Sequence, residues 1–193
     1  MANYVELSPE DLHTATSREV QAIAATEDRI PGGNYYGRVT KVTLKRINDD
    51  AEFNAGRSLA TLTTSIVAKD DPTTVLGTQF IDVSWEPRFR NDGQLDATAR
   101  RWVELVKALS ARAEDVNGVL DLVTQQLFSV KIRETFRVDS GDLLPVHAKA
   151  KVGVDGTAWV NVPTDNTSVE VYEHYYDLGY ESRAMIDRIF KAT

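Results

Sequence analysis

The chain of 193 residues contains no cysteine. Disulfides are therefore excluded, and so are zinc and iron–sulfur sites that depend on thiolate ligands. No apolar run approaches the length that a membrane-spanning helix needs, and the N-terminal stretch MANYVELSPEDLHTATSRE lacks the basic and apolar segments of a signal peptide. We therefore expect a soluble protein of the cytoplasm that does not bind membranes.

The chain has fewer basic than acidic residues, 22 Lys+Arg against 29 Asp+Glu, and its net charge is −7. Residues 1–30 carry two Lys+Arg against six Asp+Glu, and residues 152–193 carry three against seven, so each end has a net charge of −4. Residues 31–151 carry the remaining 17 Lys+Arg and 16 Asp+Glu, which gives +1. This distribution excludes a generally polybasic nucleic-acid binder but leaves room for a basic face on the central region.

The sequence also lacks the common catalytic motifs, because GxxxxGK[ST], GxGxxG and HExxH are all absent. Its histidines, His13, His147 and His174, fall in different predicted elements and do not indicate a metal site or a triad. The pairs Asp49-Asp50 and Asp70-Asp71 lie in predicted turns, where aspartate is favoured for its backbone hydrogen bonds. We therefore expect neither catalysis nor a metal or other cofactor.

The central region does contain a clear succession of predicted elements. Alternating apolar residues, bounded by turn signals, predict strands. Apolar residues at three- and four-residue spacing after Asp96, a candidate N-cap, predict a helix that includes Trp102 and Leu109. A shorter helix is predicted over Val119–Gln125 and another over Pro9–Ala25. The predicted strands are Tyr35–Ile47, Arg57–Lys69, Val75–Trp85, Leu127–Val138, Val146–Val152 and Thr157–Val162.

This order, with a helix between the third and fourth strands, is that of the OB-fold, a five-stranded Greek-key barrel. We therefore predict a mainly β fold with helices: an N-terminal helical extension (1–29), an OB-like barrel domain (30–162) and an acidic, tyrosine-rich C-terminal segment (163–193). The first strand breaks its alternation near Gly37, as a bulge would when one strand serves both halves of a barrel. OB-folds commonly bind oligonucleotides on their strand 2–3 face and adjoining loops.

Cations and aromatic rings are interleaved on several of these strands. The outward positions of Leu127–Val138 present Lys131, Arg133 and Arg137 in a row, about 6.5 Å apart for each two residues. Cations that follow a phosphate backbone, together with rings that stack on bases, are the two components of sequence-tolerant single-strand binding. The predicted contacts are Tyr35, Arg38, Lys41, Arg57, Trp85, Arg88, Phe89, Arg90, Lys131, Arg133 and Arg137.

A structural role is the alternative for each of these residues, because cations on a strand also protect sheet edges. We expect Trp102, Phe128, Ile132 and Phe136 to lie in the core. The pattern leaves Trp85 and Tyr36 open between core and surface. Because Tyr36 shares parity with Val42 and Leu44, we predict that Tyr36 is buried and that Tyr35 is the exposed stacking ring.

The segments IPGGNYYGRVTKV, GRSLATLTTSIV and ARRWVELVKALSA…VNGVLDLVTQQLFSVKIRE resemble those of phage-encoded single-stranded DNA-binding proteins with an OB-fold. The resemblance covers roughly Ile30–Val138 and rests on a P-x-G-x-Y entry strand, a G-R that opens the second strand, and a helix before an L-x-G turn. It implies binding of single strands during phage replication or recombination, in the host cytoplasm and without catalysis. The matching positions are Tyr35, Arg38, Arg57, Lys131 and Arg133.

The C-terminal segment departs from that family, in which many members end in a free acidic tail. The ending YEHYYDLGYESRAMIDRIFKAT contains four tyrosines and an apolar cluster, so we expect a packing or interface segment. Oligomerisation and contact with replication proteins stay open. The alternative function is a phage virion or assembly protein that uses the barrel as a packing module, and a nuclease or other enzyme is a third.

Overall fold

The computed structural model describes residues 29–193, so the predicted helix Pro9–Ala25 lies outside the described residues. The elements of residues 29–193 follow in this order: β1 (Gly33–Arg46), β2 (Ser58–Val67), β3 (Val75–Val83), α3 (Ala97–Ala108), α4 (Val116–Val123), β4 (Phe128–Asp139), the 3-10 helices η1 (Ser140–Asp142) and η2 (Pro145–His147), β5 (Thr157–Asn161), α5 (Ser168–Asp177) and β6 (Ser182–Lys191). Asp96 caps α3 as predicted, since its side chain accepts a hydrogen bond from Ala99 N.

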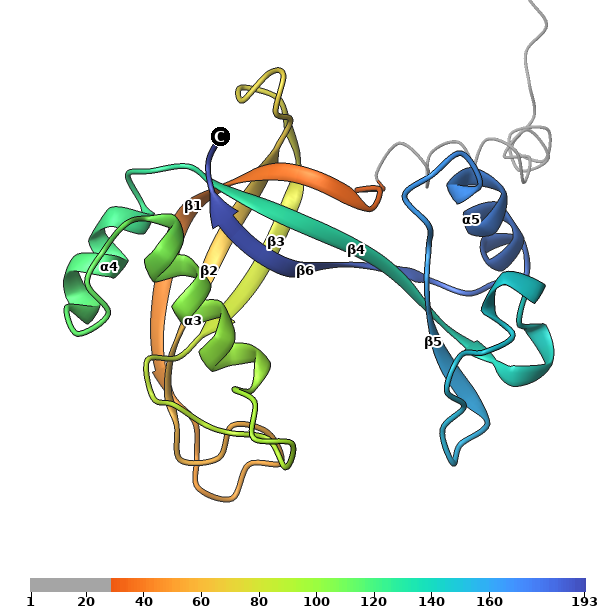
Figure 1. The fold of residues 1–193 in the computed structure, drawn as a ribbon, viewed down its shortest axis with the longest axis horizontal. Helices are drawn as coiled ribbons and strands as arrows, with labels where there is room; N and C mark the ends of the chain where they lie inside the picture. Colours follow the sequence, from red (N-terminus) through yellow and green to blue (C-terminus); the bar gives the residue numbers. More distant parts are fainter. Residues whose placement is uncertain (1–28) are drawn as a thin grey trace, which may run out of the picture.

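The strands form one antiparallel sheet in which β4 is the central element. The order is β3-β2-β1-β4-β5, and β6 lies along the opposite edge of β4. The first half of β4 pairs with β1 and its second half with β5, so this long strand joins two parts of the molecule. Figure 1 shows β4 and β6 running together from the part that holds α3 and α4 to the part that holds α5.

The outermost strands of the larger part, β3 and β6, are not paired with each other within residues 29–193. Helix α3 contacts both strands. Its Glu104 carboxylate accepts a hydrogen bond of 3.0 Å from Ile189 N on β6. The mainly β fold with helices is confirmed, whereas the sheet has six strands and is not closed into the five-stranded barrel that we expected.

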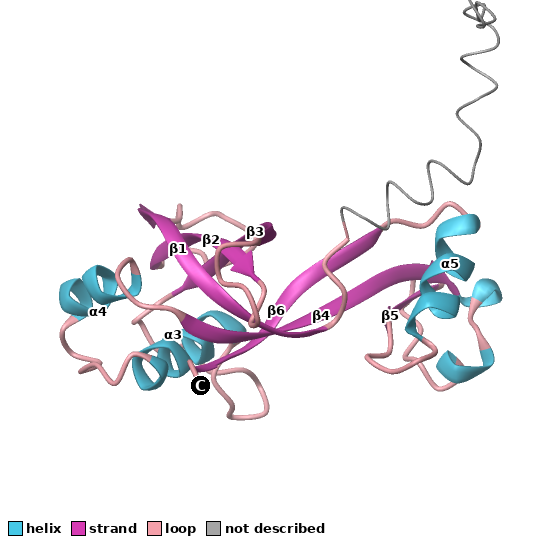
Figure 2. Ribbon diagram, turned by 90° about the horizontal axis from the view of Figure 1, so that it is seen from above, coloured by secondary structure: helices cyan, strands magenta, loops and turns pink. Residues whose placement is uncertain are grey.

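Two predictions about individual strands need correction. The predicted strand Val146–Val152 is wrong, because Pro145 begins the 3-10 helix η2 and Val152 makes only an isolated bridge to Ala158. Strand β6 was not predicted as a strand, although we expected its segment to pack rather than hang free. Figure 2 shows β6 lying along β4.

A bulge divides β1, as its interrupted alternation indicated. The register against β2 shifts between Val39 and Lys41, so the extra residue is Thr40 and not a residue near Gly37. Gly37 has a different role: a Cβ there would stand 2.7 Å from the ring of Phe128, so the close approach of β1 and β4 requires glycine. Even-numbered residues before Thr40 therefore point to the same face of the sheet as odd-numbered residues after it.

Two apolar clusters lie on either side of the middle of β4. The first contains Trp102, Phe128 and Ile132 and is enclosed by β1, β2, β3, α3, α4 and β6. The second contains Phe136 and Tyr175 and is enclosed by β4, β5 and α5. Trp102, Phe128, Ile132 and Phe136 are buried there as predicted, whereas Tyr36, which we also predicted to be buried, is only half-buried.

Glu134 is the one charged residue among the inward positions of β4, and it lies between these two clusters. It is 1% exposed and accepts hydrogen bonds of 2.8 Å from Arg29 Nε, while the Arg29 guanidinium lies 4.0 Å above the ring of Tyr172. A buried carboxylate is tolerated when it is paired and hydrogen-bonded. This pair therefore accounts for the exception in the alternation of β4 and ties residue 29 to α5.

Candidate nucleic-acid interface

The predicted row of cations on β4 is exposed. From Phe128 to Val138, the exposed residues of this strand are Lys131, Arg133 and Arg137, and every other residue is buried. The three cations are therefore exposed as predicted, whereas Ser129 and Thr135, at the other outward positions of the strand, are buried. Two of the cations already have partners: Arg133 pairs with Asp187 at 2.6 Å, and Arg137 pairs with Asp155 and donates to Thr157 Oγ1 at 3.0 Å.

Strand β1 places further cations on the same face of the sheet. Paired residues of neighbouring strands point to the same side, and Tyr36 pairs with Ser129, which shares parity with Lys131. Arg38 and Lys41 are both exposed on this side, because the bulge at Thr40 lies between them. Their parities differ in the sequence, and the bulge explains how both come to face outward.

Two of the predicted stacking rings, Tyr35 and Trp85, are wrongly placed by the sequence interpretation. Tyr35 is half-buried against the first cluster and donates a hydrogen bond of 2.8 Å to Pro31 O. Burial raises the pKa of the Tyr35 hydroxyl. Trp85 is also half-buried against this cluster, with its ring 5.9 Å from that of Trp102 in an edge-to-face arrangement. Both rings therefore pack in part against the core instead of lying open to solvent.

The rings on the same face as the β4 cations are Tyr36, which is also half-buried, and Phe80. Tyr36 donates a hydrogen bond to Thr193 O and has the Lys69 ammonium 5.3 Å from its ring centre. Phe80 is 72% exposed and lies opposite Thr63, which in turn lies opposite Lys41. We call Tyr36, Arg38, Lys41, Phe80, Lys131, Arg133 and Arg137 the outer face. Phe80 could have been found in the sequence, because it alternates with the inward-facing Ile81 and Val83.

Arg57 is not a surface cation, so its predicted contact with nucleic acid is wrong. It is 2% exposed, and its guanidinium donates to Ser84 Oγ at 3.0 Å, Asp96 Oδ2 at 2.5 Å and Glu86 O at 2.6 Å. These partners belong to the loop of residues 84–96, which connects β3 to α3. Arg57 therefore holds this loop and the cap of α3 against the start of β2.

Arg88, Phe89 and Arg90 are exposed on that same loop. Arg88 donates to Ala55 O at 2.9 Å, and Arg90 pairs with Asp92 at 3.0 Å. The loop contacts residues that follow the end of β1, whereas β1 meets β4 at its beginning. Nine residues of strand, about 30 Å, separate these two ends of β1. The structure therefore does not bring this part of the predicted site together with the cations of β4.

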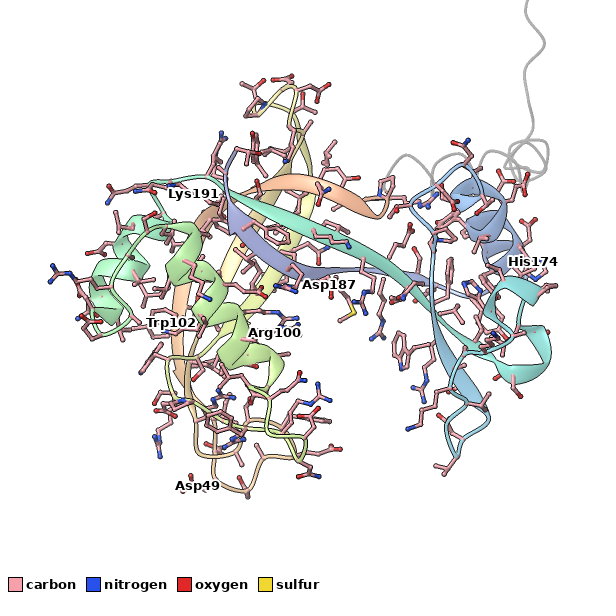
Figure 3. The ribbon with its side chains drawn as sticks, in the orientation of Figure 1. Asp49, Arg100, Trp102, His174, Asp187 and Lys191 are labelled. Carbon is pink, nitrogen blue, oxygen red and sulfur yellow. The ribbon has the colours of Figure 1, made fainter. Side chains whose placement is uncertain are left out.

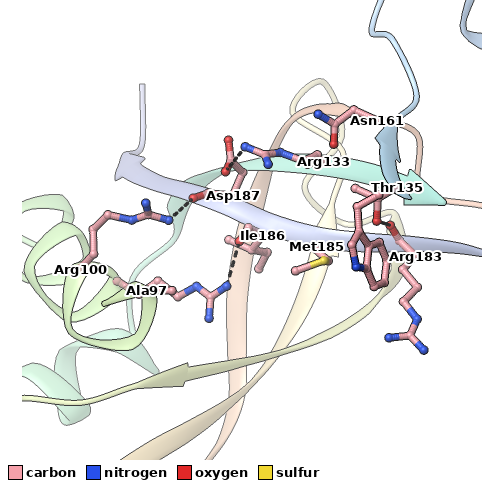
Figure 4. Close-up of a pocket in the computed structure, with 11 residues that line it drawn as sticks. Ala97, Arg100, Arg133, Thr135, Asn161, Arg183, Met185, Ile186 and Asp187 are labelled. Atoms are coloured by element: carbon pink, nitrogen blue, oxygen red, sulfur yellow. Dashed lines mark hydrogen bonds and ion pairs between the residues drawn. The ribbon is translucent and has the colours of Figure 1, made fainter. Parts of the chain in front are cut away.

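A hollow of about 510 Å³ opens beside the β4 row and was not predicted. Arg100 and Arg101 of α3, Arg133 of β4, Trp159 of β5 and Arg183 of β6 line it (Figure 4). We call it the arginine hollow. Its residues are too far apart in the sequence for a local pattern to show them together, although Trp159 lies at an exposed, alternating position of a strand that was predicted.

The positive charges of the arginine hollow outnumber the negative ones. Four arginines line it against one aspartate, Asp187, which is paired with Arg133. Arg100 lies beside Asp187 (Figure 3) and donates a long hydrogen bond of 3.5 Å to its carbonyl oxygen, while Arg101 donates one of 3.4 Å to Ile186 O. Burial, followed by the nearby Arg100 charge, lowers the pKa of Arg101. The hollow is therefore suited to anions.

No family model, curated protein or solved structure matches the chain. Within residues 29–193, no group of three or more His, Cys, Asp and Glu side chains is arranged to hold a metal ion. Each helix in this part of the chain is too short or too polar to cross a bilayer.

Proposed function

We propose that the chain is a non-catalytic single-stranded DNA-binding protein, of the phage OB-fold type, that binds its ligand along the outer face. The observation that carries this proposal is the burial pattern of β4. A strand that merely packs has no reason to reserve each exposed position before Asp139 for a cation, as β4 does with Lys131, Arg133 and Arg137. Cations aligned on one face instead suit a ligand whose negative charges also follow a line.

The physical model combines electrostatic attraction with stacking. Lys131 and Arg133 are spaced by about 6.5 Å along the strand, close to the reach between successive phosphates of an extended single strand. Tyr36 and Phe80 offer rings on the same face, and stacking on a ring tolerates any base. Tyr36 lies opposite Ser129 of β4, Arg38 and Lys41 follow it along β1, and Phe80 lies beyond Thr63. These groups continue the β4 row across the sheet, so one strand can contact all of them.

The arrangement of the larger part supports the OB-type assignment. The order β1, β2, β3, α3, β4 is that of an OB-fold, and a bulge at Thr40 lets β1 pair with both β2 and β4. Strand β6 lies along β4 at the place of a closing strand, and α3 bridges β6 to β3. OB-folds are partly open barrels, which is compatible with an unpaired β3–β6 edge. Phage replication or recombination is the process we propose.

The test is fluorescence anisotropy with a labelled oligo-dT of 30 nucleotides. The variant Lys131→Ala/Arg133→Ala/Arg137→Ala should lose at least tenfold in affinity and keep its fold, because exposed substitutions each change stability by about 0.5 kcal/mol or less. The matched control replaces three exposed cations outside the outer face, Arg112, Lys149 and Lys151, by alanine. It should bind like wild type. Equal affinity of the two triple variants would refute the outer face as the binding site.

One observation favours the alternative of a virion or assembly protein. The carboxylates of Asp187 and Asp155 already pair with Arg133 and Arg137, as they would if these cations only stabilised the surface. In that case wild type would not bind oligo-dT, and sedimentation would show self-association that the triple variant on β4 weakens.

A further inference from the structure

The arginine hollow has the volume of a small-molecule site and is open to solvent on one side. Its volume of about 510 Å³ lies within the range of about 300–1,000 Å³ that is usual for ligand pockets. Secondary structure surrounds it, with α3 on one side, β5 on the other and β4 and β6 between them (Figure 4). Arg133 is the one residue of the outer face that also lines the hollow. A ligand could therefore occupy the hollow without contacting the other outer-face residues.

The unmatched charge of the hollow calls for an anion with more than one negative charge. Arg133 pairs with Asp187 and Arg100 pairs with Glu104 at 3.8 Å, which leaves the guanidinium charges of Arg101 and Arg183 without a carboxylate partner within residues 29–193. Arg101 makes no ion pair within residues 29–193, and its Nε is buried without a hydrogen-bond partner. A terminal phosphate carries about two negative charges at neutral pH and three acceptor oxygens, whereas a phosphodiester carries one charge. The charge of the hollow therefore fits a terminal phosphate better.

A flat apolar surface lies next to these charges. Trp159 is 51% exposed, and the guanidinium carbons of Arg183 and Arg137 stand 5.7 and 6.0 Å from its ring centre. Met185, 44% exposed, lines the same hollow. An indole ring flanked by guanidinium groups is a stacking surface for a nucleobase. Inorganic phosphate would use the arginines and leave this surface unused.

We propose that the arginine hollow binds a nucleoside 5′-phosphate, with the phosphate held by the arginines of α3 and the base against Trp159. A free nucleotide and the 5′-phosphorylated end of a strand share this chemistry. The site is additional to the proposed single-strand binding and does not depend on it, because α3, β5 and β6 supply every lining residue that this recognition needs except Arg133.

Calorimetric titration of the full chain with thymidine 5′-monophosphate tests the proposal, with thymidine and inorganic phosphate as the two partial ligands. We expect the nucleotide to bind at least tenfold more tightly than either partial ligand. Binding of thymidine as tight as that of the nucleotide would overturn the role of the arginines. Binding of inorganic phosphate as tight as that of the nucleotide would overturn the role of Trp159, and absence of any binding would overturn the site.

Two variants locate the nucleotide. Trp159→Ala should weaken nucleotide binding by about fivefold or more, which corresponds to the loss of one base–aromatic stack. Arg183→Gln removes an exposed lining cation and should weaken it as well. Lys41→Ala is the control, because Lys41 lies on the outer face and outside the hollow. It should leave nucleotide binding unchanged and weaken only oligo-dT binding, so failure of one site can be told from failure of the other.

Decamers of dT with a 5′-phosphate or a 5′-hydroxyl then identify the source of the ligand. Tighter binding of the phosphorylated decamer, abolished by Trp159→Ala, assigns the hollow to the end of a strand. Equal binding of the two decamers, with nucleotide binding retained, assigns it to a free nucleotide. Weaker binding of the phosphorylated decamer would contradict the proposal, because the phosphate would then be repelled by the site.

Discussion

Replacing Arg57 by methionine separates a structural arginine from a ligand-binding one. Methionine keeps an unbranched apolar stem but removes the guanidinium, which donates to Ser84, Asn54, Asp96 and Glu86 O. Removing one partner of a buried ion pair costs about 3–5 kcal/mol. Asp96 is 22% exposed in its side chain and can recover part of its hydration, so we expect a loss near the lower limit, about 3 kcal/mol.

The matched variant is Arg38→Met, which removes the same group from the exposed surface of β1. We expect it to change the free energy of unfolding by about 0.5 kcal/mol or less and to weaken oligo-dT binding. Urea unfolding, followed by the fluorescence of Trp102 and Trp85 in the first cluster, measures the difference. In a chain of this length, a loss of about 3 kcal/mol lowers the melting temperature by about 6–12 °C.

The opposite result would refute this reasoning. If Arg57→Met unfolded at the urea concentration of wild type and lost affinity for oligo-dT, then Arg57 would be available to ligands. Its hydrogen bonds to the loop of residues 84–96 would then contribute nothing to stability. Folded Arg57→Met protein that retains binding near the wild-type level is the outcome that the structure predicts.

Three further predictions follow from contacts of the outer face and of α3. Asp155→Asn should tighten oligo-dT binding severalfold, because Arg137 loses the carboxylate that competes with phosphate. Fluorescence anisotropy at low salt measures this affinity, and an unchanged value would mean that Arg137 contacts no phosphate. Tyr36→Ala should weaken the binding free energy for oligo-dT by about 1–3 kcal/mol, whereas Tyr35→Ala should lower the melting temperature. If Tyr35→Ala weakened binding and Tyr36→Ala lowered the melting temperature, the sequence-based assignment would be restored. Burial tends to raise the pKa of Asp96, but hydrogen bonds from the amide of Ala99 and from Arg57 outweigh it and hold this pKa below its ordinary value. The stabilisation that ionised Asp96 provides is therefore complete above the unfolded pKa of about 3.9 and is lost as the pH falls through the lower folded pKa. In a plot of melting temperature against pH, Asp96→Asn should show a smaller fall at acidic pH than wild type. An identical fall in the two proteins would contradict this.

The sequence was sufficient where the alternation is regular. Strand β4 keeps one parity from Phe128 to Val138, so the exposure of its three cations could be assigned, although Ser129 and Thr135 on the same side are buried. In β1 the bulge at Thr40 changes the parity, and extending the pattern of Val42 and Leu44 back across it reversed the two tyrosines. A bulge can be inferred from a broken alternation, but its position depends on the partner strand.

Tertiary partners set the remaining features, and local patterns do not show them. The burial of Arg57 depends on Ser84 and Asp96, which lie 27 and 39 residues away in the sequence. The arginine hollow depends on α3, β5 and β6 meeting around β4, and no prediction of separate elements contains that arrangement. For the same reason the pairing of β6 with β4 was missed, although its segment was expected to pack.

The salt dependence of oligo-dT binding tests the central claim most directly. For single strands, the slope of log K against log salt concentration is about −0.7 for each phosphate neutralised, and three to six contacts give about −2 to −4. The variant Lys131→Ala/Arg133→Ala/Arg137→Ala should therefore have a slope shallower than that of wild type by about 2. Measured between about 50 and 300 mM salt, parallel lines for the two proteins, or wild-type binding that ignores salt, would contradict the account.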